Sequence, residues 1–195
     1  MKDSLSRDFK VDCVACHWQG LVTDTLPVAR DWLQSVAGQA IAGGLQRTTR
    51  GRPRLPPGMG DIGWSHSADR LLLAYAPSGT LGVDVERADR RMDALRIARR
   101  YFAGEEIYAL EALDADARGI AFLRLWCAKE AVLKAHGHGI AFGLARLAFV
   151  VDGDNLRMTA CDAALGDVAG WRLHMLSPEP GYVAVLAWRD GILPA

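Results

Sequence analysis

The sequence lacks the long apolar runs that mark membrane-spanning segments. No run approaches the roughly 18 residues that a spanning helix needs, and Met1 to Leu5 lack the apolar core of a signal peptide. Net charge is absent too, because 23 Lys and Arg residues balance 23 Asp and Glu residues. A chain without net charge has no overall electrostatic attraction to nucleic acid or to a membrane surface. We therefore expect a cytoplasmic protein with neither of these partners.

Cysteine is scarce, with four residues in the chain. Cys13 and Cys16 form a C-x-x-C pair, which a redox or metal site could use. No second pair follows at the spacing of a zinc site, and residues 11–18 have the pattern of one strand rather than of a strand-to-helix turn. We interpret both thiols as buried packing groups; the redox or metal alternative stays open.

What is present is an ordinary globular composition, with 50% hydrophobic and 24% charged residues. The 195 residues suffice for one large domain or two small subdomains. Apolar spacing and breaker residues predict helices at 28–45, 89–101, 104–113 and 116–135. Alternating or short apolar runs predict strands at 11–18, 62–67, 71–76, 81–86, 147–151, 156–159, 171–175 and 182–188. Helices and antiparallel strands are segregated, which indicates an α+β fold.

An acidic strand stands at the centre of the chain. From Leu81 to Glu86 apolar and acidic residues alternate, so that Asp84 and Glu86 share one face while the valines between them point into packing. By itself such a pair is most simply the solvated side of a strand.

A stripe on the last predicted helix changes this interpretation. Trp126, Glu130 and Lys134 follow each other at steps of four and so lie on one side of the helix. Glu130 stands among apolar neighbours, where a carboxylate is costly unless it is paired or coordinates a metal. If this helix packs against the acidic strand, Glu130 converges with Asp84 and Glu86. Three hard oxygen ligands of this kind suit Mg²⁺.

This pattern is part of a set of four sequence motifs. They are Trp64-Ser65-His66-Ser67, Gly82-Val83-Asp84-Val85-Glu86, Tyr101-Phe102-Ala103-Gly104-Glu105-Glu106 and Trp126-x-x-Lys129-Glu130-Ala131-x-x-Lys134. At this spacing the sequence resembles the 4'-phosphopantetheinyl transferases, in particular the surfactin-type group that activates carrier proteins. The resemblance runs from about Arg52 to about Val151, roughly half of the chain.

The resemblance implies an α+β fold of two similar α/β halves in a pseudo-twofold arrangement, with the active site in the cleft between them. The boundary is then expected near Gly79. Residues 1–79 would form the half that binds the phosphates of coenzyme A, and residues 80–195 the half with the metal-binding and catalytic motifs. We expect a monomer.

The resemblance also implies a Mg²⁺-dependent enzyme with holo-[acyl-carrier-protein] synthase activity. It would move the 4'-phosphopantetheine arm of coenzyme A to a serine of an apo acyl or peptidyl carrier protein and release adenosine 3',5'-bisphosphate. Asp84, Glu86 and Glu130 would hold the metal. Glu130, directly or through a metal-bound water, would be the general base, and Lys134 would contact the pyrophosphate.

Further contacts with coenzyme A are implied for Arg52, Ser65, His66 and Lys129. Arg52 stands where the family has a lysine and keeps its charge. For Ser65 and His66 the alternative is a polar strand end with a hydrogen-bonded histidine. For Lys129 and Lys134 the alternative is an ordinary solvated helix face.

Two departures from the family pattern matter. Ala103 replaces the usual serine and removes an N-cap hydroxyl worth roughly 1 kcal/mol, although Glu106 is kept. The first 46 residues contain few basic groups, so the sequence does not determine which residues bind the 3'-phosphate of coenzyme A. Arg30, Arg47 and Arg50 are the candidates.

Six arginines follow the acidic strand: Arg87, Arg90, Arg91, Arg96, Arg99 and Arg100. The absence of interleaved aromatics argues against nucleic acid. They form either a solvated helix face or, between Arg87 and Phe102, a docking surface for the carrier protein, which is an acidic helical bundle. Two other functions stay open, a Mg²⁺-dependent nucleotide pyrophosphohydrolase and a non-catalytic carrier-binding module. The sequence names neither the carrier protein nor the pathway.

Overall fold

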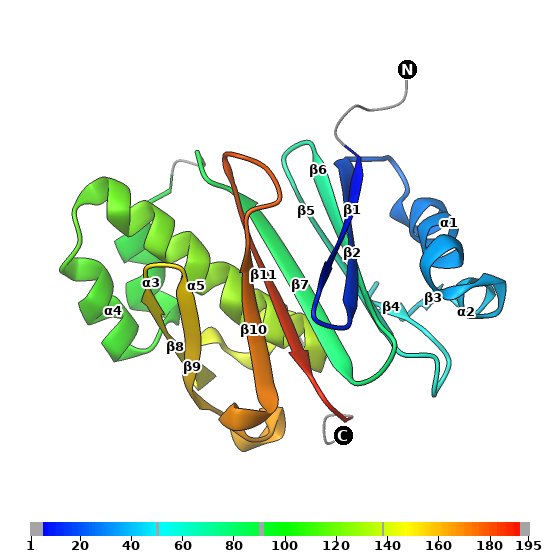
Figure 1. The fold of residues 1–195 in the computed structure, drawn as a ribbon. Coiled ribbons are helices and arrows are strands. Elements are labelled where there is room, and N and C mark those ends of the chain that lie inside the picture. Colours follow the sequence, from blue (N-terminus) through cyan, green and yellow to red (C-terminus); the bar gives the residue numbers. More distant parts are fainter. Residues whose placement is uncertain (1–5, 50, 90–91, 138, 192–195) are drawn as a thin grey trace.

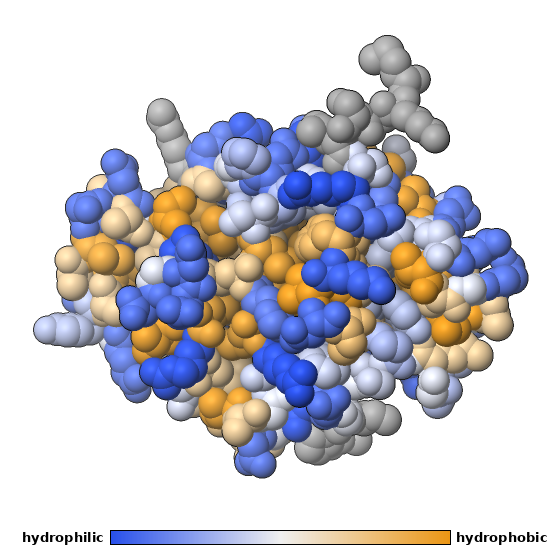
Figure 2. All heavy atoms as spheres, viewed as in Figure 1, coloured by the Kyte–Doolittle hydropathy of each residue, from blue (hydrophilic) through white to orange (hydrophobic). Residues whose placement is uncertain are grey.

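The protein has four layers, two antiparallel sheets packed face to face with helices on the outer side of each (Figure 1). This computed structural model describes residues 6–49, 51–89, 92–137 and 139–191. The predicted α+β class is confirmed. Within these ranges no helix is both long and apolar enough to cross a membrane. Figure 2 shows one face of the molecule, on which hydrophilic and hydrophobic residues are interspersed.

The first part of the chain builds a sheet with the strand order β1-β2-β6-β5. Helices α1 and α2 pack Trp32, Leu33 and Ala42 against the outer face of this sheet, where Ile62 and Leu73 meet them. The bounds are β1 (Arg7–Val11), β2 (Val14–Gly20), α1 (Thr25–Ala37), α2 (Gln39–Gly43), β3 (Gln46–Arg47), β4 (Pro53–Arg54), β5 (Asp61–Ser67) and β6 (Arg70–Ala76).

The rest of the chain builds a sheet with the order β10-β11-β7, and β8 pairs with β9 beside it. Helix α5 packs Ala131 and Val132 in one core with Val185 and Ala187 of β11. The bounds are β7 (Thr80–Arg87), α3 (Ala94–Tyr101), α4 (Gly104–Glu111), α5 (Ala115–His136), β8 (Leu147–Asp152), β9 (Asn155–Cys161), β10 (Trp171–Leu176) and β11 (Tyr182–Arg189). Because β6 lies in one sheet and β7 in the other, the chain crosses between the sheets near Gly79; a domain boundary there stays a prediction.

Three elements differ from the predictions. The strand predicted over 11–18 is a hairpin that turns at Asp12 and Cys13, since Asp12 adopts a φ of +51°. Cys13 is therefore exposed, and only Cys16 is the buried thiol that we predicted. The helix predicted over 28–45 is broken at Gly38, whose φ of +91° no helix can contain.

The third difference is the start of α3. The helix begins at Ala94 rather than near residue 89, because the Asp93 side chain accepts the amide of Arg96 and caps it. The long helix α5 agrees with the prediction, and Gly137 ends it in the left-handed conformation with a φ of +89°.

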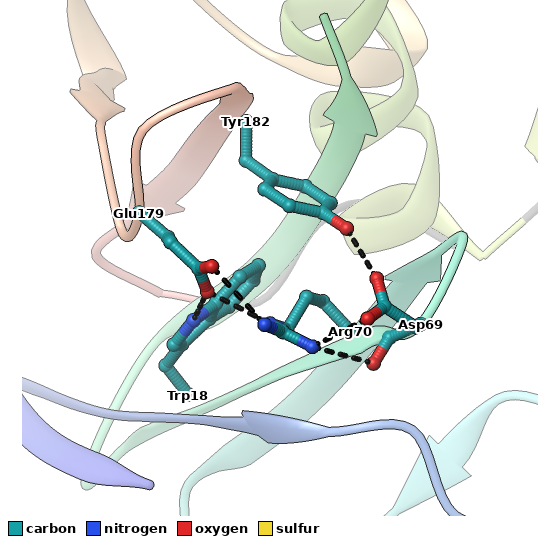
Figure 3. A network of polar contacts seen from close by, with 5 residues as sticks. All are labelled: Trp18, Asp69, Arg70, Glu179 and Tyr182. Carbon is teal, nitrogen blue, oxygen red and sulfur yellow. Dashed lines mark hydrogen bonds and ion pairs between the residues drawn. The ribbon is translucent and has the colours of Figure 1, made fainter. Parts of the chain in front are cut away.

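Five polar residues tie the turns of the two sheets together (Figure 3). Arg70 Nε donates to Glu179 Oε2 at 2.7 Å, and Arg70 Nη1 donates to Asp69 Oδ2 at 2.7 Å. Trp18 Nε1 donates to Glu179 at 3.0 Å, and the Tyr182 hydroxyl donates to Asp69 Oδ1 at 2.7 Å. This polar network of Trp18, Asp69, Arg70, Glu179 and Tyr182 fixes the β5–β6 turn against the second half of the chain.

Strand β7 serves two interfaces at once. Its alternate residues Leu81, Val83 and Val85 are buried in the core between the two sheets. Gly82 lies on the other face, where α5 packs so closely that a Cβ would overlap the carbonyl oxygen of Ala131. Glycine is thus what allows the helix to lie directly on the strand.

Gly82→Ala should lower the free energy of unfolding by at least about 2 kcal/mol, because the added methyl group meets helix backbone and not a movable side chain. Gly119→Ala, in α5 itself, is the matched control. Nothing lies within 4 Å of a Cβ there, and alanine is favoured over glycine in a helix by about 1 kcal/mol. Denaturant unfolding measures both variants. Similar effects of the two substitutions would contradict the close approach of α5 to β7.

Candidate active site

Strands β5 and β7 are the edge strands of their two sheets, and they lie side by side. Ser65 Oγ on β5 donates to Asp84 Oδ1 on β7 at 2.8 Å, and Ser67 Oγ donates to Glu86 Oε2 at 2.8 Å. Because residues two apart on a strand share a face, these two hydrogen bonds follow each other along the line where β5 meets β7. We call this line the β5–β7 seam and the two hydrogen bonds its serine rungs. Ser67 was not predicted as a site residue. The S-x-S spacing opposite D-x-E is the signal that could have indicated it.

A pocket of about 380 Å³ opens along this seam. Six of the eight predicted site residues line it, so the structure brings together side chains that are far apart in the sequence. The lining consists of Trp64, Ser65 and His66 from β5, Asp84 and Glu86 from β7, and Trp126, Glu130 and Lys134 from α5.

Asp84 Oδ1 accepts hydrogen bonds from two side chains of the pocket. Lys134 Nζ donates to Asp84 Oδ1 at 2.6 Å and to Ser65 Oγ at 2.9 Å. Burial acts to lower the pKa of Lys134, but the Asp84 carboxylate outweighs it and the pKa is raised. The second oxygen of Asp84, Oδ2, is buried and has no hydrogen-bond partner. An orphaned carboxylate oxygen beside two further carboxylates is a place where a cation would be stabilised.

No ready-made metal site is present among the described residues, since no three His, Cys, Asp or Glu side chains are arranged to hold an ion. In this conformation the ammonium of Lys134 supplies the positive charge next to Asp84. The donors are nevertheless all oxygens, which is what Mg²⁺ requires. The donor chemistry thus fits a divalent cation, and the magnesium site stays a prediction.

Glu130 lies on the opposite wall, and its residue is only 8% exposed. Burial, together with the carboxylates of Asp84 and Glu86, raises the pKa of Glu130 to about 7, and Lys134 acts in the other direction. A carboxyl group with this pKa can take up or release a proton near neutral pH.

Two further pockets continue the first one. A mainly apolar pocket of about 290 Å³ shares Trp64 and Lys134 with it and contains Arg52. On the other side, a pocket of about 420 Å³ shares His66 and Glu86. The three pockets form one trough along the β5–β7 seam.

Arg52 is held in place at the apolar end of the trough. Its Nη2 donates to Asp61 Oδ2 at 2.7 Å, and Asp61 in turn accepts the amide of Leu81. Arg47 lies near, with its guanidinium 5.1 Å from the centre of the Trp64 ring. Arg30 donates to the carbonyl of Leu45 instead, and Arg50 lies outside the described residues.

Lys129 is the predicted site residue that the structure places elsewhere. Its side chain has no exposed surface, and Nζ lies 2.8 Å from Glu106 Oε2. The ammonium also donates to the carbonyls of Leu144 and Leu147. Lys129 is therefore not available to a substrate, and the expected coenzyme A contact is corrected. Its neighbour Glu130 faces the pocket because successive residues point in different directions around a helix.

Glu106 connects this buried pair to two backbone segments. Its carboxylate accepts the amide of Ala103 at 3.0 Å and the amide of Phe149 at 2.9 Å. Ala103 provides no side-chain cap for α4, as expected from the missing serine hydroxyl. Burial raises the pKa of Glu106 and lowers that of Lys129, and each partner opposes the effect on the other. The pair thus joins α4, α5 and β8 in the interior.

Lys129→Met should lower the free energy of unfolding by about 3–5 kcal/mol, because it leaves the Glu106 carboxylate buried and uncompensated. Adding Glu106→Gln should recover part of this loss, since no buried charge then remains. Arg99→Met is the control, because it breaks an exposed ion pair with Glu111 and should cost less than about 1 kcal/mol. Denaturant unfolding compares the wild type with both single variants, the double variant and the control. A double variant as unstable as the sum of its single variants would show that the two side chains do not act as a pair.

Glu130→Gln should stabilise the metal-free protein at pH 8 and change little at pH 5. The folded-state pKa of about 7 lies above the ordinary value of 4.5. The neutral acid is thus favoured in the folded state, and its stabilising contribution is lost as the pH rises through 7. At about 1.4 kcal/mol per pKa unit, glutamine should gain up to about 3 kcal/mol at pH 8. Denaturant unfolding in a chelator measures the difference, and an equal effect at both pH values would contradict it.

Comparison with known proteins agrees with this geometry. The model of the 4'-phosphopantetheinyl transferase superfamily matches residues 80–186, more than half of the chain and the part that contains Asp84, Glu86, Glu130 and Lys134. A candidate 4'-phosphopantetheinyl transferase of Synechocystis sp. is 37% identical over 109 residues, which are 56% of this chain and 43% of the relative.

Two further relatives match as well. The 4'-phosphopantetheinyl transferase HetI of Nostoc sp. is 30% identical over 144 residues, 71% of this chain and 57% of the relative. The 4'-phosphopantetheinyl transferase Sfp of Bacillus subtilis is 34% identical over 92 residues, 47% of this chain and 39% of the relative. The chain spans about half the length of these curated relatives. From the family match and the residues within it, the chain belongs to the 4'-phosphopantetheinyl transferase superfamily.

Proposed function

We propose that this protein transfers the 4'-phosphopantetheine arm of coenzyme A to a serine of an apo carrier protein and releases adenosine 3',5'-bisphosphate. One observation carries the proposal: in a chain of this superfamily, Asp84, Glu86 and Glu130 line one pocket together with Lys134. A divalent cation needs the carboxylates, and a phosphate needs the ammonium as a point charge. A pocket with both suits a pyrophosphate substrate.

The trough offers a path for the whole of coenzyme A. We place the nucleotide in the apolar pocket, where Trp64 supplies an aromatic surface and Arg52 a charge. Arg47, next to the Trp64 ring, is the described candidate for the 3'-phosphate. The pyrophosphate then lies at Lys134, which belongs to both adjoining pockets. The pantetheine arm continues towards His66 and the third pocket.

Asp84, Glu86 and Glu130 would hold Mg²⁺ in the central pocket. A bound magnesium ion neutralises charge on the pyrophosphate and so makes it easier to attack. The unpartnered Oδ2 of Asp84 supports this assignment. For a cation to reach Asp84, Lys134 has to release it, and a phosphate is a suitable new partner for the ammonium.

The chain's own residues then carry out the proton and charge transfers. Glu130, which lines the pocket beside Lys134, accepts the proton of the carrier serine, directly or through a water molecule. The serine oxygen attacks the β-phosphate, and the bond from this phosphorus to the bridging oxygen of the pyrophosphate breaks. Lys134, His66 and Arg52 stabilise the charge that develops on the phosphate oxygens.

We place the docking surface for the carrier protein near Arg87 to Phe102, next to the third pocket. Arg87 and Arg99 already form ion pairs within the chain, with Asp89 at 2.5 Å and Glu111 at 2.6 Å; Arg90 and Arg91 lie outside the described residues. The charges of these two arginines are thus compensated within the chain. Tyr108, 78% exposed on α4, adds apolar surface that a helical partner could cover.

Intact-mass spectrometry of an apo carrier protein, incubated with this protein, coenzyme A and Mg²⁺, tests the proposal. We expect a mass gain of one phosphopantetheine group on the carrier and a stoichiometric release of adenosine 3',5'-bisphosphate. Asp84→Ala should abolish the gain, because a metal ligand and the partner of Lys134 are lost. Asp154→Ala, which removes a carboxylate with a 96% exposed side chain, should leave it unchanged.

Other outcomes assign other functions. Breakdown of coenzyme A without a carrier would indicate a pyrophosphohydrolase with water as the acceptor. Carrier binding without a mass gain would indicate a binding module. Full transfer by Asp84→Ala at ordinary Mg²⁺ concentrations would overturn the metal assignment.

A further inference from the structure

Ser67 makes a contact that the mechanism above does not use. Its hydroxyl donates to Glu86 Oε2 at 2.8 Å and accepts the backbone amide of Arg87 at 3.1 Å. A serine hydroxyl has one donor and two acceptor sites, and here it engages the side chain of one residue and the backbone of the next. It therefore holds both the carboxylate of Glu86 and the backbone directly after Glu86.

The two serine rungs of the seam are not equivalent. Ser65 is shared between Asp84 and the ammonium of Lys134, which lies 2.9 Å away. Ser67 instead lines the third pocket, at its junction with the central pocket where Glu86 belongs to both. Ser67 is thus the part of the first half that reaches the carboxylate farthest along the trough.

The turn that carries Ser67 is held from the other side. Asp69 and Arg70 directly follow Ser67 and Ala68 in the β5–β6 turn, and they bond to Tyr182 and Glu179 of the second half (Figure 3). Ala68, between Ser67 and Asp69, adopts a φ of +52°, which is uncommon for any residue with a side chain. Such a conformation persists where the surrounding contacts enforce it. The polar network thus places Ser67 before any ligand arrives.

We propose that Ser67 is a positioning residue that directs the carboxylate of Glu86 towards the cation in the central pocket. The inference rests on the proposed function, and it goes beyond it by assigning a role to a hydroxyl that the proposed transfer chemistry leaves unused. A free glutamate side chain has several rotatable bonds, and a hydrogen bond removes part of this freedom. Hydrogen-bond partners of metal-ligating groups typically change metal affinity by about 10–100-fold.

The test is a double-mutant cycle on Mn²⁺ affinity, measured by electron paramagnetic resonance of the free ion in the full-length chain. Mn²⁺ prefers the same oxygen donors as Mg²⁺. Ser67→Ala should weaken binding about 10-fold, and Glu86→Gln should weaken it as well. In the Glu86→Gln background, Ser67→Ala should add less than about twofold, because the carboxylate that it orients is gone.

Three variants separate positioning from general damage. Ser67→Thr keeps the hydroxyl and should restore most of the affinity. Ser67→Cys replaces a strong donor by a weak one of similar shape and repeats the test if the alanine variant does not fold. Thr80→Val is the matched control, because it removes the hydroxyl that donates to the Gly191 carbonyl at the far end of β7 and should leave Mn²⁺ affinity unchanged.

Transfer assays supply an independent readout. In Ser67→Ala the Mg²⁺ concentration for half-maximal transfer should rise about 10-fold, while the rate at saturating Mg²⁺ approaches that of the wild type. Mn²⁺ affinity within twofold of wild type, additive losses in the cycle, or a wild-type protein that binds no Mn²⁺ would overturn the role of Ser67. Absence of transfer by the wild type would overturn the proposed function instead, so the two failures are distinguishable.

Discussion

The direct contact of α5 with β7 at Gly82 is the constraint on which the site depends. Only a residue without a side chain allows helix backbone to lie against the strand at that point. The helix stripe that carries Glu130 and Lys134 thereby comes within reach of Asp84 and Glu86, which lie two and four residues further along the strand. Packing, and not any local motif, creates the cluster of charges.

The cluster is electrostatically incomplete by itself. Three carboxylates share the pocket with one ammonium; burial, with the charges of Asp84 and Glu86 adding to it, raises the pKa of Glu130, and Oδ2 of Asp84 has no hydrogen-bond partner. A ligand that brings positive charge relieves this imbalance. This imbalance is the physical reason for proposing a cation in the pocket.

The second half does not build the site alone. Edge strand β5 supplies the serine hydroxyls of the two rungs, and the polar network around Arg70 keeps the β5–β6 turn in place. The relative position of the two sheets therefore sets the geometry of the acidic residues.

The sequence by itself determined what depends on local periodicity. Alternation placed Asp84 and Glu86 on one face, steps of four placed Glu130 and Lys134 on one stripe, and the glycine after His136 ended the helix, because each of these follows from the geometry of a single element. The α+β class was predictable for the same reason. The hairpin at Asp12 was missed because a non-glycine residue with positive φ carries little local signal.

Only the tertiary structure decided which charges are available. Lys129 and Glu130 are neighbours in the sequence, yet one is paired with Glu106 in the interior and the other faces the pocket. That difference depends on which surfaces meet the two sides of α5, and those surfaces come from segments distant in the chain. The Ser67–Glu86 contact likewise joins residues 19 positions apart. Such pairings are set by how the layers pack: the S-x-S and D-x-E spacings can suggest a contact, but only the packing brings β5 next to β7.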